Sequence, residues 1–228
     1  GTLANQADIT NYAQGISKIP LMITLDGEWG LSMRLQDAPS YPRNLVIGAI
    51  SDDEIVRLYG EEIARQSKEM GIHVNFAPVL DVNSNPQNPV IGSRAFGENA
   101  SNVAKKGIAY SLGLESNGVM AVAKHFPGHG DTSEDSHLTL PTINHNKSRL
   151  DQVELLPFKE YINAGLSGMM TGHLNVPALQ TKGMPSSLSP EVTTKLLKES
   201  MGFTGLSFTD GMAMKGVSSQ ADASVKAL

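Results

Sequence analysis

Short apolar runs alternate along the chain with longer segments in which apolar residues recur at helical spacing. A short apolar run bounded by polar turns is typical of a strand buried on both faces of a parallel sheet. Five such runs predict buried strands at residues 20–25, 74–79, 119–123, 168–171 and 206–209.

The longest helical pattern covers residues 51–70. Three apolar residues fall on one face of this segment, namely Ile55, Tyr59 and Ile63. Ser51 and Glu54 are spaced as a capping box, and Gly71 follows as a stop signal. We therefore expect a helix that buries this face.

Other boundary signals lie in the second half of the chain. Ser148 with Asp151 has the spacing of a second capping box, and Ser189 before Pro190 resembles an N-cap followed by a favoured first helical residue. Pro157 interrupts a helical pattern and is expected to kink that helix.

Strands that alternate with helices predict right-handed βαβ units and an α/β fold with a parallel sheet. The sheet could close as a (β/α)8 barrel of the TIM type or stay open and doubly wound, and periodicity leaves both open. A closed barrel needs about eight strands. The chain begins and ends in helix-like stretches, so we expect residues 1–228 to form a single domain, a barrel incomplete at both ends, excerpted from a longer protein.

Composition narrows the function classes. With 228 residues, 40% of them hydrophobic, the chain can bury one sizeable core. The net charge is −5, and there is no Lys or Arg cluster, which argues against nucleic acid or anionic lipid as a partner. No apolar run approaches the roughly 18 residues of a membrane span, and residues 1–15 lack a signal-peptide pattern. The absence of cysteine excludes disulfides and thiolate metal sites, but leaves the compartment open.

Polar side chains follow each predicted strand. Because the carboxyl ends of parallel strands share one edge of a sheet, these groups are expected to converge on a single site. They are Asp26 and Glu28, then Asp81, then Lys124 and His125, then His173, and finally Asp210. Any one of them could instead cap a helix or bond to loop amides.

Five motifs stand in a fixed order along the chain. Residues 124–132 read KHFPGHGDT and are followed by DSH at 135–137. The other four are LDGEWG at 25–30, NFAPVLDV at 75–82, NPVIGSRAFG at 88–97 and FTD at 208–210. In order and spacing the set resembles glycoside hydrolase family 3, in particular its bacterial β-N-acetylglucosaminidases, over nearly the whole chain.

This resemblance implies a (β/α)8 barrel and a retaining mechanism with a covalent glycosyl-enzyme intermediate. Asp210 matches the family nucleophile. Retaining glycosidases generally add a second carboxylic acid, whereas the DSH motif matches a dyad in which His137 is the general acid/base and Asp135 orients it. Histidine, with an ordinary pKa of about 6.5, suits a group that donates and accepts a proton near neutrality.

The resemblance also implies which residues bind the terminal sugar. The matching positions are Asp26, Arg94, Lys124 and His125, with Arg34 and His173 as further candidates. Asp26 and Lys124 could instead form only a structural ion pair. Residues 27–30 depart from the Gln-Glu-Gly-Gly form of many family members, and Trp29 could stack on a sugar or pack under its loop.

The implied substrate is terminal β-linked N-acetylglucosamine, as in peptidoglycan fragments of bacteria. Muropeptide recycling in the cytoplasm and wall or glycan turnover outside it both fit. We expect a carbohydrate substrate, with no cofactor, no metal and no nucleic-acid partner.

Three alternatives stay open. His125 and His129 are four residues apart, as in a metal-dependent barrel hydrolase, although Pro127 and the neighbouring glycines break any helix that would align them. A non-catalytic sugar-binding module would keep the barrel but would be expected to lack Asp210 or the dyad. Phosphate could replace water as the acceptor, since a histidine acid/base does not repel it.

Overall fold

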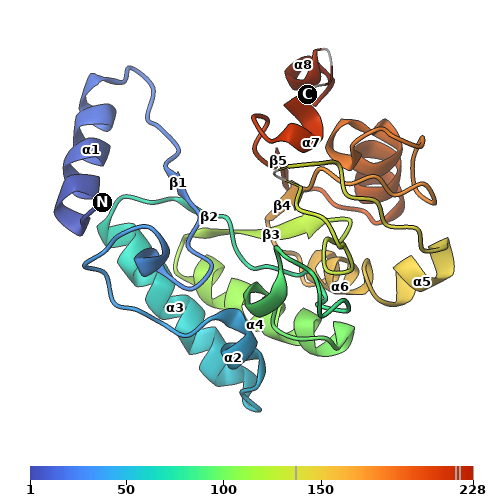
Figure 1. Cartoon of the computed structure of the whole chain (residues 1–228). Helices are drawn as coiled ribbons and strands as arrows, with labels where there is room; N and C mark the ends of the chain where they lie inside the picture. The colour runs from blue at the N-terminus through green and yellow to red at the C-terminus, as the bar shows by residue number, and fades with distance from the viewer. Residues whose placement is uncertain (137, 219, 221, 228) are drawn as a thin grey trace.

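The computed structural model describes residues 1–136, 138–218, 220 and 222–227. Across these residues one five-stranded parallel sheet forms (Figure 1), in the order β1-β2-β3-β4-β5. Its strands are β1 (Thr24–Leu25), β2 (Val74–Asn75), β3 (Met120–Phe126), β4 (Gly168–Thr171) and β5 (Leu206–Thr209).

The strand order identifies the architecture. Neighbouring strands in the sheet are also neighbours in the sequence, without the reversal of order that defines a doubly wound sheet. Consecutive strands of a (β/α)8 barrel have this order. The barrel prediction is therefore confirmed, and the described part of the chain forms a half-barrel.

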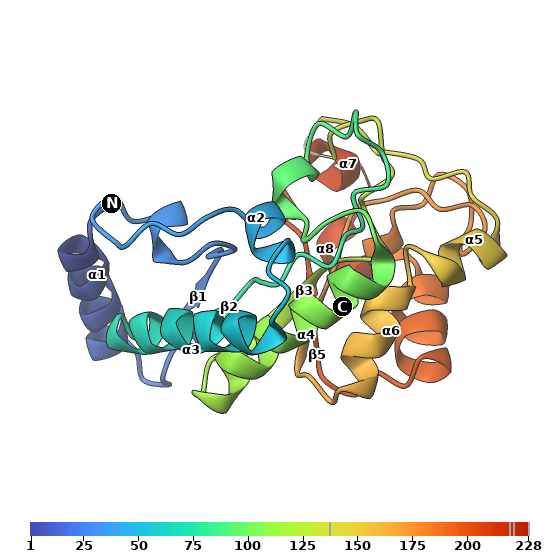
Figure 2. The same ribbon diagram turned by 90° about the horizontal axis from the view of Figure 1, so that it is seen from below.

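Helices cover the outer side of the sheet. Figure 2 shows α3, α4 and α6 in a row along this side, while α7 lies with the loops at the opposite side of the molecule. The longer helices are α1 (Leu3–Ile16), α3 (Asp53–Glu69), α4 (Ala100–Ser116), α6 (Leu156–Asn163) and the π-type helix η4 (Glu191–Ser200). The shorter ones are η1 (Leu31–Met33), α2 (Asn44–Gly48), η2 (Gly92–Arg94), α5 (Lys147–Gln152), η3 (Ser186–Leu188), α7 (Lys215–Ser218) and α8 (Ala223–Lys226). Among the described residues, no helix has both the length and the apolar character of a bilayer span.

The prediction of fully buried strands is wrong at both edges of the sheet. Residues 20–22 are exposed and precede β1, and Leu206 of β5 is 46% exposed. Each of these strands pairs with a single neighbour in the described sheet, so one side of each lacks a packing partner. The inner strands β3 and β4 are buried as expected.

The prediction for the helix at 51–70 is confirmed for Ile63, which is buried, and for Tyr59, which packs against the core, but it is wrong for Ile55. Ile55 is 50% exposed, and the buried face contains Val56, Gly60 and Ile63. The reason is the close approach of α3 to α4, where a Cβ added at Gly60 would lie 2.2 Å from the carbonyl oxygen of Tyr110. A hydrophobic pattern gives no weight to glycine, so it misses this contact. Gly71 follows the helix end with φ of 69°, as predicted.

Residues outside the predicted capping boxes cap the starts of two helices. Asp52 caps α3 in place of Ser51, and Asn146 caps α5 in place of Ser148. Pro157 lies in the first turn of α6, so the expected kinked helix is two separate helices. The hydroxyl of Ser189 donates to the Glu191 carboxylate and does not cap the backbone.

The two faces of the sheet have different roles. The outer face of β3, with Ala121 and Ala123, packs into the main core against the helices. The inner face carries Val122, which clusters with Val74 and Met170. Because side chains alternate along a strand, the residue two positions after Val122 also points inward.

Candidate active site

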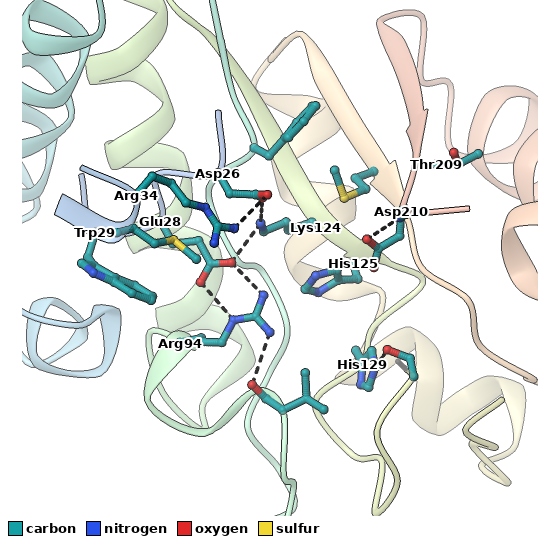
Figure 3. A pocket seen from close by; sticks show the side chains of 16 residues that line it. Asp26, Glu28, Trp29, Arg34, Arg94, Lys124, His125, His129, Thr209 and Asp210 are labelled. Atoms are coloured by element: carbon teal, nitrogen blue, oxygen red, sulfur yellow. Dashed lines mark hydrogen bonds and ion pairs between the residues drawn. The ribbon is translucent and has the colours of Figure 1, made fainter. Parts of the chain in front are cut away.

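A pocket of about 520 Å³ opens at the carboxyl ends of the strands. Alternation brings Lys124 into it two residues after Val122, and Asp210 two residues after Phe208. The register of β3 with β4 shifts between Ala123 and Phe126, which is where Lys124 and His125 enter the site. Figure 3 shows Asp26, Glu28, Arg34 and Arg94 on one side of this pocket and His125 with Asp210 on the other.

Five charged residues form a network on the first side. Lys124 Nζ lies 2.8 Å from Asp26 Oδ1 and 2.9 Å from Glu28 Oε1. Arg94 donates two hydrogen bonds to the Glu28 carboxylate, from Nε at 3.0 Å and from Nη2 at 2.7 Å. The more exposed Arg34 reaches Asp26 Oδ2 at 3.1 Å. The Asp26–Lys124 ion pair thus exists, and it lines the pocket as well.

Glu28 is the buried centre of this network. Its side chain is fully buried, and burial alone would raise its pKa, but Lys124 and Arg94 outweigh that effect and lower the pKa to about 2. The ionised carboxylate fixes both cations, and Asp26 stays 37% exposed toward the pocket. The arrangement presents preorganised hydrogen-bond donors and acceptors to the pocket.

A second buried carboxylate fixes the histidines. Asp81 is fully buried and lies 2.7 Å from His125 Nδ1, while it also accepts the backbone N–H of His125 and, at 2.6 Å, that of His129. Burial would raise the pKa of Asp81, but His125 and His129 together lower it. Asp81 therefore sets the ring orientation of His125 at the pocket wall.

Asp210 follows β5 directly and is held at both ends. Its backbone N–H donates to the Thr171 carbonyl at 2.9 Å, and its Oδ1 accepts from the Gly211 N–H at 2.7 Å. Burial would raise the pKa of this carboxyl, but nearby His125 and the Gly211 N–H lower it. Asp210 is therefore an ionised, oriented carboxylate, with the properties of a nucleophile.

His173 lies behind the pocket rather than in its wall. It is fully buried, with Nδ1 2.7 Å from the Ser187 hydroxyl and Nε2 3.1 Å from the Gly211 carbonyl oxygen. Burial lowers its pKa. The expectation of a sugar contact does not fit this position, because both nitrogens are already bonded; the side chain supports the turn after Asp210.

The loop that carries the predicted dyad is fastened to its surroundings. Asn88 Nδ2 donates to the carbonyl oxygens of His129 and Gly130, at 2.8 and 3.1 Å. Ser136 lines the pocket, and Asp135 precedes it. His137 lies outside the described residues, so its predicted role remains a prediction.

Three side chains of the site were not among the predicted binding residues. Glu28 and Asp81 were noted only as polar residues at strand ends, and His129 only as a rival metal ligand. His129 is buried between the hydroxyls of Thr132 and Ser136, at 2.8 and 2.9 Å. The partners of Glu28 and Asp81 lie far away in the sequence, so no local signal reveals their burial, whereas the hydroxyl partners of His129 lie within seven residues of it.

Two pairs of neighbouring side chains bear on the roles of Trp29 and of the two histidines His125 and His129. The guanidinium of Arg43 lies 3.7 Å from the centre of the Trp29 ring, so a cation covers one face of this tryptophan at the pocket edge. The rings of His125 and His129 are 5.8 Å apart, edge to face, and their bonded nitrogens face Asp81, Thr132 and Ser136 rather than a shared point.

Comparison with known proteins identifies the family of this chain. Residues 2–228 match the family described as "Glycosyl hydrolase family 3 N terminal domain". The chain is 40% identical to Beta-hexosaminidase A of Pseudoalteromonas piscicida over 221 residues, which are 90% of this chain and 37% of that protein. It therefore spans well under half the length of this relative.

Two solved structures are similar over almost the whole chain. A glycoside hydrolase family 3 β-N-acetylglucosaminidase from Paenibacillus sp. str. FPU-7 has a TM-score of 0.95 and 38% identity, covering 100% of this chain and 45% of that one. A structure titled "Beta-glucoside phosphorylase BglX" has a TM-score of 0.91 and 26% identity, covering 95% of this chain and 41% of that one.

Proposed function

The chain belongs to glycosyl hydrolase family 3, and we propose that it carries the catalytic site of a retaining exo-β-N-acetylglucosaminidase. One observation carries the proposal: an ionised Asp210 faces a network of sugar-binding type across a single pocket. The name of the similar Paenibacillus protein, a β-N-acetylglucosaminidase, supports the choice of N-acetylglucosamine, and the name of the Pseudoalteromonas piscicida protein, a β-hexosaminidase, supports a hexosaminide substrate. Residues 1–228 act in this account as one catalytic domain.

The first half-reaction uses both sides of the pocket. Asp26, Arg34, Arg94, Lys124 and His125 hold the terminal sugar by its hydroxyl and acetamido groups. An Asp210 carboxylate oxygen attacks the anomeric carbon as the bond to the leaving oxygen breaks, and His137 gives its proton to that oxygen. The product is a glycosyl ester on Asp210.

The second half-reaction reverses the roles. Neutral His137 takes a proton from a water molecule, and the oxygen of that water attacks the anomeric carbon and displaces Asp210. Two inversions leave the β configuration unchanged. Asp135 stabilises the imidazolium form of His137 and fixes its tautomer. The natural substrate in this account is a peptidoglycan fragment with terminal β-linked N-acetylglucosamine.

Phosphate is the second candidate acceptor. The similar structure titled as a β-glucoside phosphorylase favours this option, and so do the cations of Arg34, Arg94 and Lys124 along the pocket. In that case phosphate oxygen attacks the glycosyl ester and releases a sugar 1-phosphate. The acid/base residue, a histidine, adds no negative charge against it.

One assay separates these outcomes. The purified protein is given 4-nitrophenyl β-N-acetylglucosaminide and the corresponding β-glucoside, with and without phosphate, and the sugar product is followed by NMR. We expect the acetamido substrate to be preferred and β-N-acetylglucosamine to form first, with no phosphate dependence. Sugar 1-phosphate as the main product would make the protein a phosphorylase. Lack of binding of either glycoside would contradict the proposal.

A further inference from the structure

A second cluster of ionisable groups lies outside the wall of the active-site pocket. Asp131 belongs to the loop after β3, His145 precedes α5, and Glu154 lies between α5 and α6. One ligand atom from each residue lies within 4.8 Å of the other two. Three separate segments of the chain therefore bring a carboxylate, an imidazole and a second carboxylate together.

Glu154 contains the least satisfied group of the cluster. The residue is 3% exposed, and its Oε1 accepts from Arg149 Nη2 at 3.1 Å. Its Oε2 is buried without a hydrogen-bond partner among the described residues. Leaving a buried acceptor unpaired typically costs about 1–3 kcal/mol, and more for a charged group. Burial also raises the pKa of Glu154, as expected for a carboxyl that lacks a full set of partners.

The position of Glu154 is fixed by the motif after β3. Gly128 has φ of 123°, and a Cβ added there would lie 2.9 Å from Glu154 Cβ. The backbone of the loop therefore packs directly on this residue. This packing fixes the main chain and Cβ of Glu154 beside the loop that carries Asp131.

Asp131 and His145 complete the cluster and are reachable from solvent. Nε2 of His145 contacts Asp131 Oδ2, and Asp131 Oδ1 accepts from the Ser84 hydroxyl at 3.2 Å. Their side chains are 23% and 34% exposed. A neighbouring pocket of about 280 Å³ is lined by Asp131 and four further polar residues, namely Ser133, Glu134, Thr142 and Asn144. This pocket gives solvent access to the Asp131 side of the cluster.

We propose that Asp131, His145 and Glu154 bind a divalent transition-metal ion of the Zn²⁺ type. One imidazole and two carboxylates are a donor set that Zn²⁺ accepts, with a water as a fourth ligand. Two negative charges exceed the single positive charge of Arg149, which leaves the cluster attractive to a dication. Tetrahedral ligands of Zn²⁺ lie about 3–3.5 Å apart, so small side-chain movements close the site.

The proposed metal site is structural and takes no part in the glycosidase reaction. Asp131 lies four residues before Asp135, so a bound ion would tie the start of the dyad loop to the turn between α5 and α6. The ion would replace the direct contact of His145 with Asp131 and give Glu154 Oε2 a partner. This is independent of whether water or phosphate accepts the glycosyl group.

Titration of the metal-free, chelator-treated protein with Zn²⁺ tests the site by calorimetry and by the melting temperature. We expect one tight site and a rise of several degrees in Tm. Asp131→Asn and His145→Gln should each weaken binding at least tenfold and remove the Tm rise. The control Asp151→Asn, which changes an exposed pair with Lys147 on α5, should bind as the wild type.

A further variant, Asp210→Asn, separates this cluster from the active-site pocket and should retain the tight site. Circular dichroism checks that each variant folds. If a variant fails to fold, zinc anomalous scattering from wild-type crystals locates the ion directly. Absence of tight binding would overturn the proposal, with the cluster serving only as an ion-pair network. Wild-type binding by both ligand variants, or zinc located at His125 or His129 alone, would overturn it as well.

Discussion

The carboxylate of Asp81 lies 2.7 Å from Nδ1 of His125 and also accepts the backbone N–H of the same residue. One buried group thereby fixes both the ring and the main chain at the pocket wall. Asp81→Asn should lower the free energy of unfolding by about 3 kcal/mol. Hydrogen bonds to a charged carboxylate are strong, and the loss of a buried charged partner is costly. The substitution should also raise KM, since His125 loses its orientation. Urea unfolding and steady-state kinetics measure the two effects.

The exposed pair of Lys147 and Asp151 provides a control for this substitution. Asp151→Asn removes a surface carboxylate, and surface ion pairs contribute about 0–1 kcal/mol. Equal losses of stability in the two variants would show that Asp81 has no special role.

Stability should fall in acid because of His129. Burial and the proximity of His125 lower the pKa of His129 to about 4, from an ordinary value of 6.5. Between pH 6.5 and pH 4 this histidine is protonated in the unfolded chain but neutral in the folded protein. The free energy of unfolding therefore decreases as the pH falls through this range, by about 3 kcal/mol in total. Denaturant unfolding across this range should show the loss.

His129→Gln should flatten the pH dependence in that window, since glutamine has no proton to gain. Parallel curves for wild type and His129→Gln would contradict the assignment.

Gly130 permits a close approach within the GHG motif. A Cβ at this position would lie 1.7 Å from the carbonyl oxygen of Val82, a rigid backbone atom. Gly130→Ala should therefore destabilise the protein by about 3 kcal/mol and displace the loop that carries the dyad, with a fall in kcat. Gly15→Ala in α1 meets no atom within 4 Å and should be neutral or stabilising. Thermal unfolding of both variants checks the contrast.

The acid role of His137 predicts a dependence on the leaving group. His137→Ala should slow glycosylation by about 10²–10⁴-fold for a natural disaccharide, but much less for a nitrophenyl glycoside, whose good leaving group needs no proton. Asp135→Ala should show a weaker form of the same pattern. Single-turnover rates plotted against leaving-group pKa provide the measurement.

Glu134 is the rival carboxylic acid in the same loop, and its side chain accepts from the Thr139 hydroxyl at 3.3 Å. Glu134→Ala should leave the slope of that plot unchanged. A steeper slope for Glu134→Ala, with none for His137→Ala, would transfer the acid role to Glu134.

Local patterns predicted the framework of this protein well. The five strand positions and the convergence of Asp26, Lys124 and Asp210 on one pocket follow from alternation and from the polarity of strand ends. These features depend on neighbours in the sequence, so a single chain reveals them.

Features that depend on distant partners were missed. The buried face of α3 depends on contact of Gly60 with Tyr110, fifty residues away, and the orientation of His125 depends on Asp81. His173 has a strand-end position like the others, yet its bonds to Ser187 and Gly211 turn it away from the pocket. A side chain's role here is decided by which partner folding brings to it, and no local spacing encodes that choice.

Covalent labelling of Asp210 is the most direct test of the central claim. The protein is incubated with a fluorinated N-acetylglucosaminyl fluoride, which forms the glycosyl ester quickly and hydrolyses slowly, and is then digested and sequenced by mass spectrometry. We predict one added sugar, carried by Asp210 in the peptide spanning residues 199–215, and none in Asp210→Asn. A sugar attached to another carboxylate, or turnover of the substrate with inversion and no labelled protein, would contradict the account.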